Sequence, residues 1–165
     1  MRKKKKKDYY WKNSVERKLP NIFKRFWIVS LLRIQGWGFW KSKFRCKLLR
    51  MTGMKVEQSH IGQDVIFDSV HPEDIEIGKN CAITFRCIII THFVHSKKGT
   101  HWYTNGKVKI GNNVFMGAHS IICQAVTIGD DVIIAAGSVV TKDIPSGEVW
   151  GGVPARFIRK LEGYE

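Results

Sequence analysis

Residues 110–145 read IGNNVFMGAHSIICQAVTIGDDVIIAAGSVVTKDIP, and this stretch decides the architecture of the chain. Neither the 3.6-residue period of a helix nor the two-residue period of a strand explains its spacing of aliphatic residues. The spacing predicts a coil with flat faces, in which each face takes six residues, one aliphatic side chain points inward, and three faces complete a turn. The positions at this six-residue spacing are Ile110, Met116, Ile122, Ile128, Ile134 and Val140.

The same period continues upstream, with two interruptions. Ile77, Ile83 and Ile89 keep the spacing of six, but Ile61 precedes Ile77 by sixteen residues. We therefore expect an irregularity in FDSVHPED, residues 67–74. Twenty-one residues separate Ile89 from Ile110, which predicts that residues 91–107 leave the coil as a loop. Loops on a rigid scaffold are where functional residues concentrate.

The residues from Ile110 to Arg159 resemble the hexapeptide-repeat acyltransferases, most of all the sugar O-acetyltransferases of the galactoside and maltose type. TKDIP at 141–145 and GVPAR at 152–156 are the most specific parts of this resemblance, which extends over residues 61–160. It implies an all-β solenoid, namely a left-handed parallel β-helix of hexapeptide repeats with an excursion loop and an N-terminal helical segment.

Four segments are predicted along the chain. We expect a basic disordered tail over residues 1–14, because six consecutive basic residues repel one another. A helical segment rich in basic and aromatic residues follows over 15–58, with a break near Gly36 and Gly38. The β-helix is expected over 59–150, with the loop at 91–107, and a short terminal element over 151–165.

Charge is distributed unevenly between the two parts of the chain. Residues 1–50 hold seventeen Lys or Arg against two acidic residues, a charge of +15, whereas residues 51–165 hold eleven against twelve. Basic residues among aromatic ones suggest contact with an anionic membrane surface; the alternative is a helix packed on the coil with its cations in water. No nucleic-acid recognition motif accompanies the basic residues. Without a secretory signal or CxxC spacing, we expect a cytoplasmic protein with reduced cysteines, at the inner face of the membrane if residues 1–50 bind it.

Acetyl transfer to a hydroxyl requires a general base. His92 is the candidate, because the family carries its catalytic histidine in a similar H-x-V-H at the start of a matching loop, and imidazole titrates near neutral pH. His95 would orient His92 or the acceptor, unless it is merely a loop histidine. Asp68 is the candidate acidic partner, with a plain turn aspartate as the alternative. His119 is a weaker alternative base.

Residues of the predicted loop could also recognise the acceptor. His101, Trp102 and Tyr103 could line its pocket, because aromatic faces suit sugar rings, or could fold the loop onto a neighbouring subunit. The acceptor implied by the resemblance is a sugar or a polysaccharide precursor, which includes a lipid-linked one.

The resemblance further implies that coenzyme A lies along the coil, between two subunits of a homotrimer. Positions that match the family's cofactor-binding residues are Phe115, Gly117, Ala118, Ala136, Thr141, Lys142, Arg156 and Arg159. Lys142, Arg156 and Arg159 would bring positive charge to the phosphates of the coenzyme.

The predicted function is therefore that of an acetyl-CoA-dependent O-acetyltransferase with no metal. Two alternatives share the fold. One is transfer to an amine, to serine or to an antibiotic hydroxyl. The other is a metal-binding β-helix of the γ-carbonic anhydrase type, for which His92, His95 and His119 would be the ligands.

Overall fold

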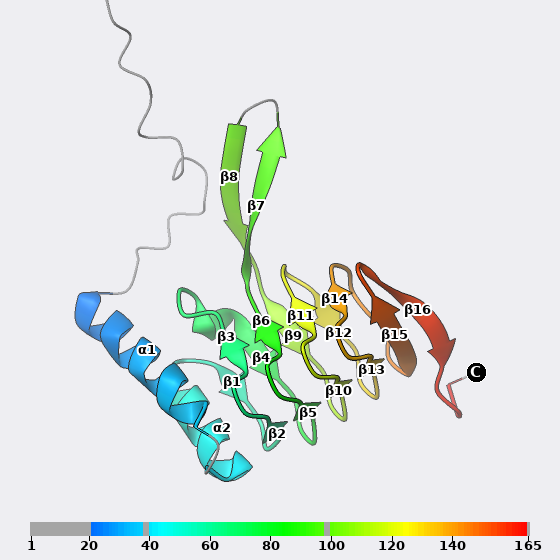
Figure 1. The fold of residues 1–165 in the computed structure, drawn as a ribbon, viewed down its shortest axis with the longest axis horizontal. Helices are drawn as coiled ribbons and strands as arrows, with labels where there is room; N and C mark the ends of the chain where they lie inside the picture. The colour runs from blue at the N-terminus through cyan, green and yellow to red at the C-terminus, as the bar shows by residue number, and fades with distance from the viewer. Residues whose placement is uncertain (1–20, 38–39, 98–99, 165) are drawn as a thin grey trace, which may run out of the picture.

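The computed structural model describes residues 21–37, 40–97 and 100–164. Short strands stack in parallel into three faces of a left-handed β-helix, which confirms the predicted fold class (Figure 1). Face A contains β1 (Lys55–Val56), β4 (Ile75–Ile77), β9 (Val108–Ile110) and β12 (Thr127–Ile128). Face B contains β2 (His60–Ile61), β5 (Ala82–Ile83), β10 (Phe115–Met116), β13 (Ile133–Ile134), β15 (Glu148–Gly152) and β16 (Ala155–Lys160). Face C contains β3 (Ile66–Phe67), β6 (Ile88–Ile89), β11 (Ile121–Ile122) and β14 (Val139–Val140).

The aliphatic residues at every sixth position form the core of this coil. All six residues from Ile110 to Val140 at that spacing are at most 2% exposed, and so are Ile77, Ile83 and Ile89. The neighbouring residue of each two-residue strand points outward, so that Ile133 is only half-buried beside the fully buried Ile134. Burying one such side chain contributes about 1.5–3 kcal/mol relative to exposure. The repeat is therefore stabilised one turn at a time, by stacking on its neighbours.

Strand register locates the two interruptions of the period. Phe115 pairs with Ile133 across one regular turn of eighteen residues. His60 pairs with Ala82, four residues more than a regular turn, and the extra length includes a 3₁₀ turn at Pro72–Asp74. Ala82 pairs with Phe115, and this longer turn contains an antiparallel hairpin of β7 (His92–Lys97) and β8 (Thr100–Asn105). Both interruptions thus lie where the spacing predicts them, and the hairpin projects away from the coil (Figure 1).

Amide and carboxylate side chains stabilise the corner between faces A and B. Asn80, Asn113 and Asp131 adopt φ values of 54–56°, which Asn and Asp tolerate better than most residues. The Asn80 amide donates to Asn113 Oδ1 at 3.0 Å, and the Asn113 amide donates to Asp131 Oδ1 at 2.9 Å. These bonds run parallel to the coil axis and connect three successive turns.

Two helices cover the N-terminal end of the coil, α1 (Ile22–Gln35) and α2 (Ser42–Met51) (Figure 1). The Asn21 side chain accepts from the amides of Phe23 and Lys24 and so caps α1. Cys46 and Leu49 of α2 are fully buried against the first turn of the coil. The coil begins at β1, before residue 59, because Val56 is already buried and β1 pairs with β4.

The structure describes the C-terminal end of the chain but not residues 1–20. Residues 1–14, predicted as a disordered tail, lie outside the described residues. At the other end, β15 and β16 pair antiparallel and form the terminal element within residues 148–160. Neither of the described helices has the length and apolar character needed to cross a membrane.

Candidate active site

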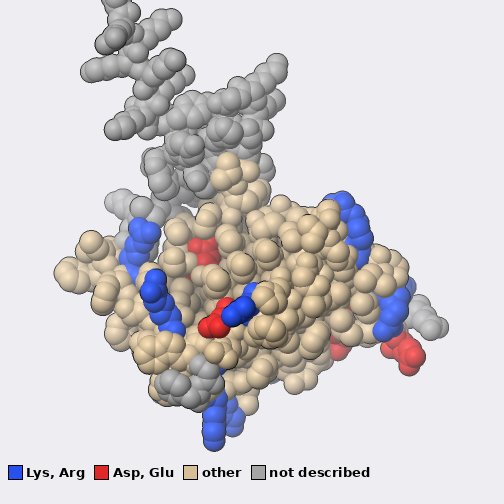
Figure 2. Space-filling view, viewed as in Figure 1, with Lys and Arg blue, Asp and Glu red and all other residues tan. Residues whose placement is uncertain are grey.

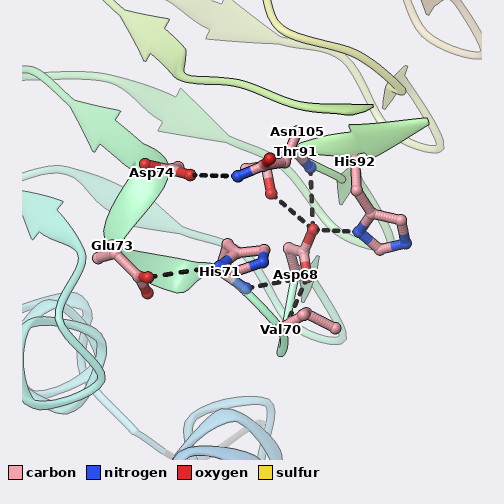
Figure 3. Close-up of polar contacts among 8 residues, drawn as sticks. All are labelled: Asp68, Val70, His71, Glu73, Asp74, Thr91, His92 and Asn105. Carbon is pink, nitrogen blue, oxygen red and sulfur yellow. Dashed lines mark hydrogen bonds and ion pairs between the residues drawn. The ribbon is translucent and has the colours of Figure 1, made fainter. Parts of the chain in front are cut away.

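Asp68 and His92 meet at the corner between faces C and A. Each follows a strand of face C, because Asp68 comes directly after β3 and His92 begins β7 shortly after β6. β3 and β6 pair in parallel with Phe67 beside Ile89, so their ends lie on adjacent turns. The stacking of these two turns therefore brings together two residues that are twenty-four positions apart (Figure 3).

The two side chains form a close hydrogen bond. His92 Nδ1 lies 2.6 Å from Asp68 Oδ2, in the short range expected when an ionised carboxylate accepts. The Asp68 side chain is 1% exposed, whereas the His92 side chain is 39% exposed. The carboxylate is thus shielded from water, while the imidazole remains accessible to a substrate.

Further donors fix the Asp68 carboxylate in place (Figure 3). Thr91 donates to Oδ2 from its hydroxyl at 2.7 Å and from its amide at 3.0 Å. The Val70 amide donates to Oδ1 at 2.8 Å. Burial raises the pKa of Asp68, but the hydrogen bonds from Thr91, Val70 and His92 outweigh burial and hold that pKa below its ordinary value. Asp68 is therefore a carboxylate at neutral pH.

This charge state determines which nitrogen of His92 carries the proton. An ionised carboxylate only accepts hydrogen bonds, so Nδ1 of His92 must be the donor. In a neutral imidazole the lone pair then lies on Nε2, on the side of the ring away from Asp68 (Figure 3). This arrangement fits the predicted role of His92 as a general base, and Thr91 supports it although the sequence motif did not single Thr91 out.

The end of the hairpin that joins the coil is held in place beside this pair. The Asn105 amide donates to Asp74 Oδ2 at 3.3 Å, and Asp74 belongs to the 3₁₀ turn that follows Asp68 (Figure 3). The β7–β8 register places Asn105 opposite His92. The irregular turn after face C and the hairpin therefore converge on the candidate base.

The predicted acceptor residues all lie in this hairpin. In its register, His95 is opposite Trp102, Tyr103 is opposite Val94, and His101 is opposite Ser96. Their backbone thus continues the strand pair that His92 and Asn105 begin. The orientation of these four side chains stays a prediction.

The predicted cofactor residues are distributed over more than one corner of the chain. Ala118 and Ala136 lie at the corner between faces B and C on successive turns, where the Gly137 amide donates to the Ala118 carbonyl at 2.8 Å. Thr141 and Lys142 follow β14 and lie at the corner between faces C and A, the same corner as Asp68. A single chain therefore presents these residues on both sides of face C.

Other members of the cofactor set differ in exposure. Phe115 on β10 is 45% exposed, and the Arg156 and Arg159 side chains on β16 are exposed as well. Gly117 is buried, and a Cβ there would overlap the Ala136 amide nitrogen. Gly117 thus allows two turns to stack closely, a structural role that stands beside its predicted part in cofactor binding.

His119 and His60 lie apart from the Asp68–His92 pair, whereas the His71 amide donates to Asp68 Oδ1 at 3.5 Å. His119 is at the corner between faces B and C and packs edge-on against Phe85, with ring centroids 5.3 Å apart. His60 Nδ1 lies 3.0 Å from the Ser42 hydroxyl. Within the described part of the chain, no three His, Cys, Asp or Glu residues gather in a way that could hold a metal ion.

Known proteins share this fold and this sequence pattern. A family model described as a hexapeptide repeat of succinyl-transferase matches residues 107–142. The protein named "Putative acetyltransferase YvoF" of Bacillus subtilis (strain 168) is 34% identical over 141 residues, which cover 86% of this chain and 78% of that protein. The chain belongs to the hexapeptide-repeat acetyltransferases, and it is an acyltransferase.

Two solved structures place it near the sugar O-acetyltransferases of that family. A maltose O-acetyltransferase from Clostridium difficile 630 superposes with a TM-score of 0.60 at 28% identity, covering 86% of this chain and 88% of that chain. A galactoside acetyltransferase in complex with coenzyme A superposes with a TM-score of 0.63 at 26% identity, covering 85% and 82%.

Proposed function

We propose that this acetyltransferase moves the acetyl group of acetyl-CoA to a hydroxyl of a sugar or polysaccharide precursor, with His92 as general base. The observation that carries the proposal is the 2.6 Å contact between His92 Nδ1 and a buried, hydrogen-bonded Asp68 carboxylate. The similarity to maltose and galactoside acetyltransferases supports a carbohydrate acceptor.

The proton and the electron pairs follow a direct path. His92 Nε2 takes the proton of the acceptor hydroxyl as the hydroxyl oxygen forms a bond to the acetyl carbonyl carbon. The carbon–sulfur bond then breaks, and His92 returns the proton to the departing thiolate. Asp68 stabilises the imidazolium that exists between these two transfers, since its negative charge lies against Nδ1. No covalent bond to the protein is needed.

The donor would lie along face C, where the predicted cofactor residues flank the surface. Phe115 and Ala136 are exposed, which leaves room for the pantetheine arm, and Lys142 is an exposed cation suited to a phosphate. The coenzyme A bound to the similar galactoside acetyltransferase supports this donor. Each site would lie between two chains of a homotrimer, as the family resemblance implies.

A thiol-release assay tests the reaction. Purified protein is mixed with acetyl-CoA and, in turn, with mono- and oligosaccharides, amino sugars and serine. We expect release of free thiol that depends on a carbohydrate hydroxyl. Release that depends only on an amine or on serine would contradict the proposed acceptor class and leave the acetyltransferase assignment in place.

A further inference from the structure

We propose that the outer surface of α1 and α2 binds an anionic lipid bilayer, and we call this surface the helical face. It consists of the exposed apolar residues of both helices and the exposed cations beside them. The apolar members are Ile22, Phe23, Phe26, Trp27, Phe44 and Met51. The cationic members are Lys24, Arg25, Arg33, Lys43, Lys47 and Arg50.

Helix α1 carries large apolar residues on both of its sides. Ile28, Leu31 and Gln35 face the protein and are at most 4% exposed. The residues that face away are also large and apolar, since Phe23 is 80% exposed and Phe26 is 73% exposed. A surface helix normally turns polar residues to water, and a soluble protein rarely leaves such an apolar patch uncovered. The outward side of α1 is therefore suited to contact with another apolar surface, such as the interior of a lipid bilayer.

Helix α2 adds a row of positive charge to the same end of the molecule. Lys43, Lys47 and Arg50 follow at spacings of four and three, which places them on one side of the helix, and all three are exposed. Phe44 and Met51 border this row and are 39% and 49% exposed. In Figure 2, Lys and Arg side chains appear over the end of the molecule that carries the helices. Aromatic residues beside cations are what an anionic membrane surface attracts.

The charge of the surrounding sequence favours an anionic partner. Between Glu16 and Glu57 the chain contains no acidic residue and eleven Lys or Arg. Residues 1–20 join α1 at the end where Ile22 and Phe23 are exposed, and they include the run from Arg2 to Lys7. A tail of that charge is repelled by the cations of α2, so it does not suit the role of a cover for the helical face. The basic run and the apolar residues of the helices would instead attract the same anionic surface in two ways, by charge and by apolar burial. Stable peripheral attachment to a membrane usually needs two such contributions.

Co-sedimentation of the full chain with lipid vesicles tests this proposal. Vesicles of phosphatidylcholine alone are compared with vesicles that contain about one third phosphatidylglycerol. We expect sedimentation with the anionic vesicles and much less with the neutral ones. Raising the salt from about 0.1 M to about 1 M, which shortens the Debye length from about 10 to about 3 Å, should weaken the binding.

Two double variants probe the helical face, and a third is their control. Phe26→Ser with Trp27→Ser should lower the vesicle partition coefficient about tenfold or more through lost apolar burial. Lys43→Glu with Lys47→Glu should lower it about tenfold through lost attraction. Lys79→Glu with Arg86→Glu changes the net charge equally at exposed positions of the coil, and should leave the partition coefficient within about twofold. Far-UV circular dichroism and thermal unfolding establish that each variant is folded.

Three results would overturn the proposal. Equal vesicle binding by the wild type and both helical-face variants would assign the attraction to the tail alone. A change of molecular mass in the Phe26→Ser, Trp27→Ser variant, without a change in vesicle binding, would make the face a contact between copies of the chain. Binding to single-stranded RNA but not to anionic vesicles would make the partner a nucleic acid.

Discussion

At the scale of residues, the environment of Asp68 controls what His92 can do. Thr91, Val70, His71 and His92 together make five hydrogen bonds to the Asp68 carboxylate, and its side chain is almost completely shielded from solvent. The ionised carboxylate in turn fixes the tautomer of His92 and aligns its ring. The reactivity of the exposed imidazole therefore depends on a residue that an acceptor does not touch.

Replacing Asp68 by Asn tests this dependence. The amide has nearly the shape of the carboxylate, but it carries no negative charge to stabilise the imidazolium. We expect kcat for thiol release to fall about tenfold or more, with little change in the KM for acetyl-CoA. The measurement is steady-state thiol release at several pH values. An unchanged kcat and an unchanged pH profile in Asp68→Asn would remove Asp68 from the mechanism.

The same carboxylate predicts how stability varies with pH. Its pKa is lower in the folded chain than the value of about 3.9 expected after unfolding. The stabilisation by the charged form is therefore complete above about pH 4 and is lost as pH falls through the lower, folded pKa. Chemical unfolding at pH 7 should show Asp68→Asn to be less stable by about 2 kcal/mol. This difference should shrink below about pH 4, and a difference that grows in acid would contradict the assignment.

The sequence predicted the two central residues of this site, but it did not predict their contact or the role of Thr91. The HFVH motif and the resemblance pointed to His92, and the resemblance, which implies an acidic or amide partner from an earlier turn, pointed to Asp68. Their contact required the register of β3 and β6, which depends on where the irregular turn places its extra residues. Thr91 was missed because a threonine in a loop has no pattern of its own; its role arises only because it lies opposite Asp68.

At the scale of elements, each short strand contributes one inward and one outward side chain. Ile133 and Ile134 are neighbours on β13, and only Ile134 belongs to the fully buried core. The six-residue period predicted this difference directly, because the inward position recurs in the sequence. The start of the coil was harder to locate, since Val56 and Ile61 are five residues apart and do not keep the period.

These two isoleucines form a matched pair for a stability experiment. Ile134→Ala should lower the free energy of unfolding by about 2–5 kcal/mol, because it removes buried apolar contacts and leaves a cavity. Ile133→Ala, the same change one residue earlier, should cost clearly less, since that side chain is only half-buried. Denaturant titration of both variants provides the measurement. Equal losses would argue against the inward orientation of the repeat.

At the scale of the whole molecule, three regions with different proposed roles lie at different points along the coil. The helices lie at one end, the Asp68–His92 pair and the hairpin lie on the turns next to them, and β15 and β16 with Arg156 and Arg159 lie at the other end (Figure 1). The helical face was anticipated from composition alone, but the sequence did not reveal that α1 would turn aromatic residues outward. That depended on which side of α1 packs on the coil.

The family resemblance implies a homotrimer with donor sites between chains, and the positions of the predicted cofactor residues on both sides of face C are compatible with such a shared site. If one chain's face C supplies only part of each donor site, the active species is the homotrimer. Sedimentation equilibrium should then give a mass three times the 19.0 kDa of one chain. A fully active species of single-chain mass would contradict the shared site.

We propose that His92 removes the acceptor proton, and a comparison of coenzyme binding with turnover in His92→Ala tests this role. Calorimetry measures the affinity of His92→Ala for acetyl-CoA, and thiol release with the preferred acceptor measures its kcat. We predict an affinity within about threefold of the wild type and a kcat lower by about 10²–10⁴-fold, the usual contribution of a general base. Undiminished kcat in this variant would contradict the claim.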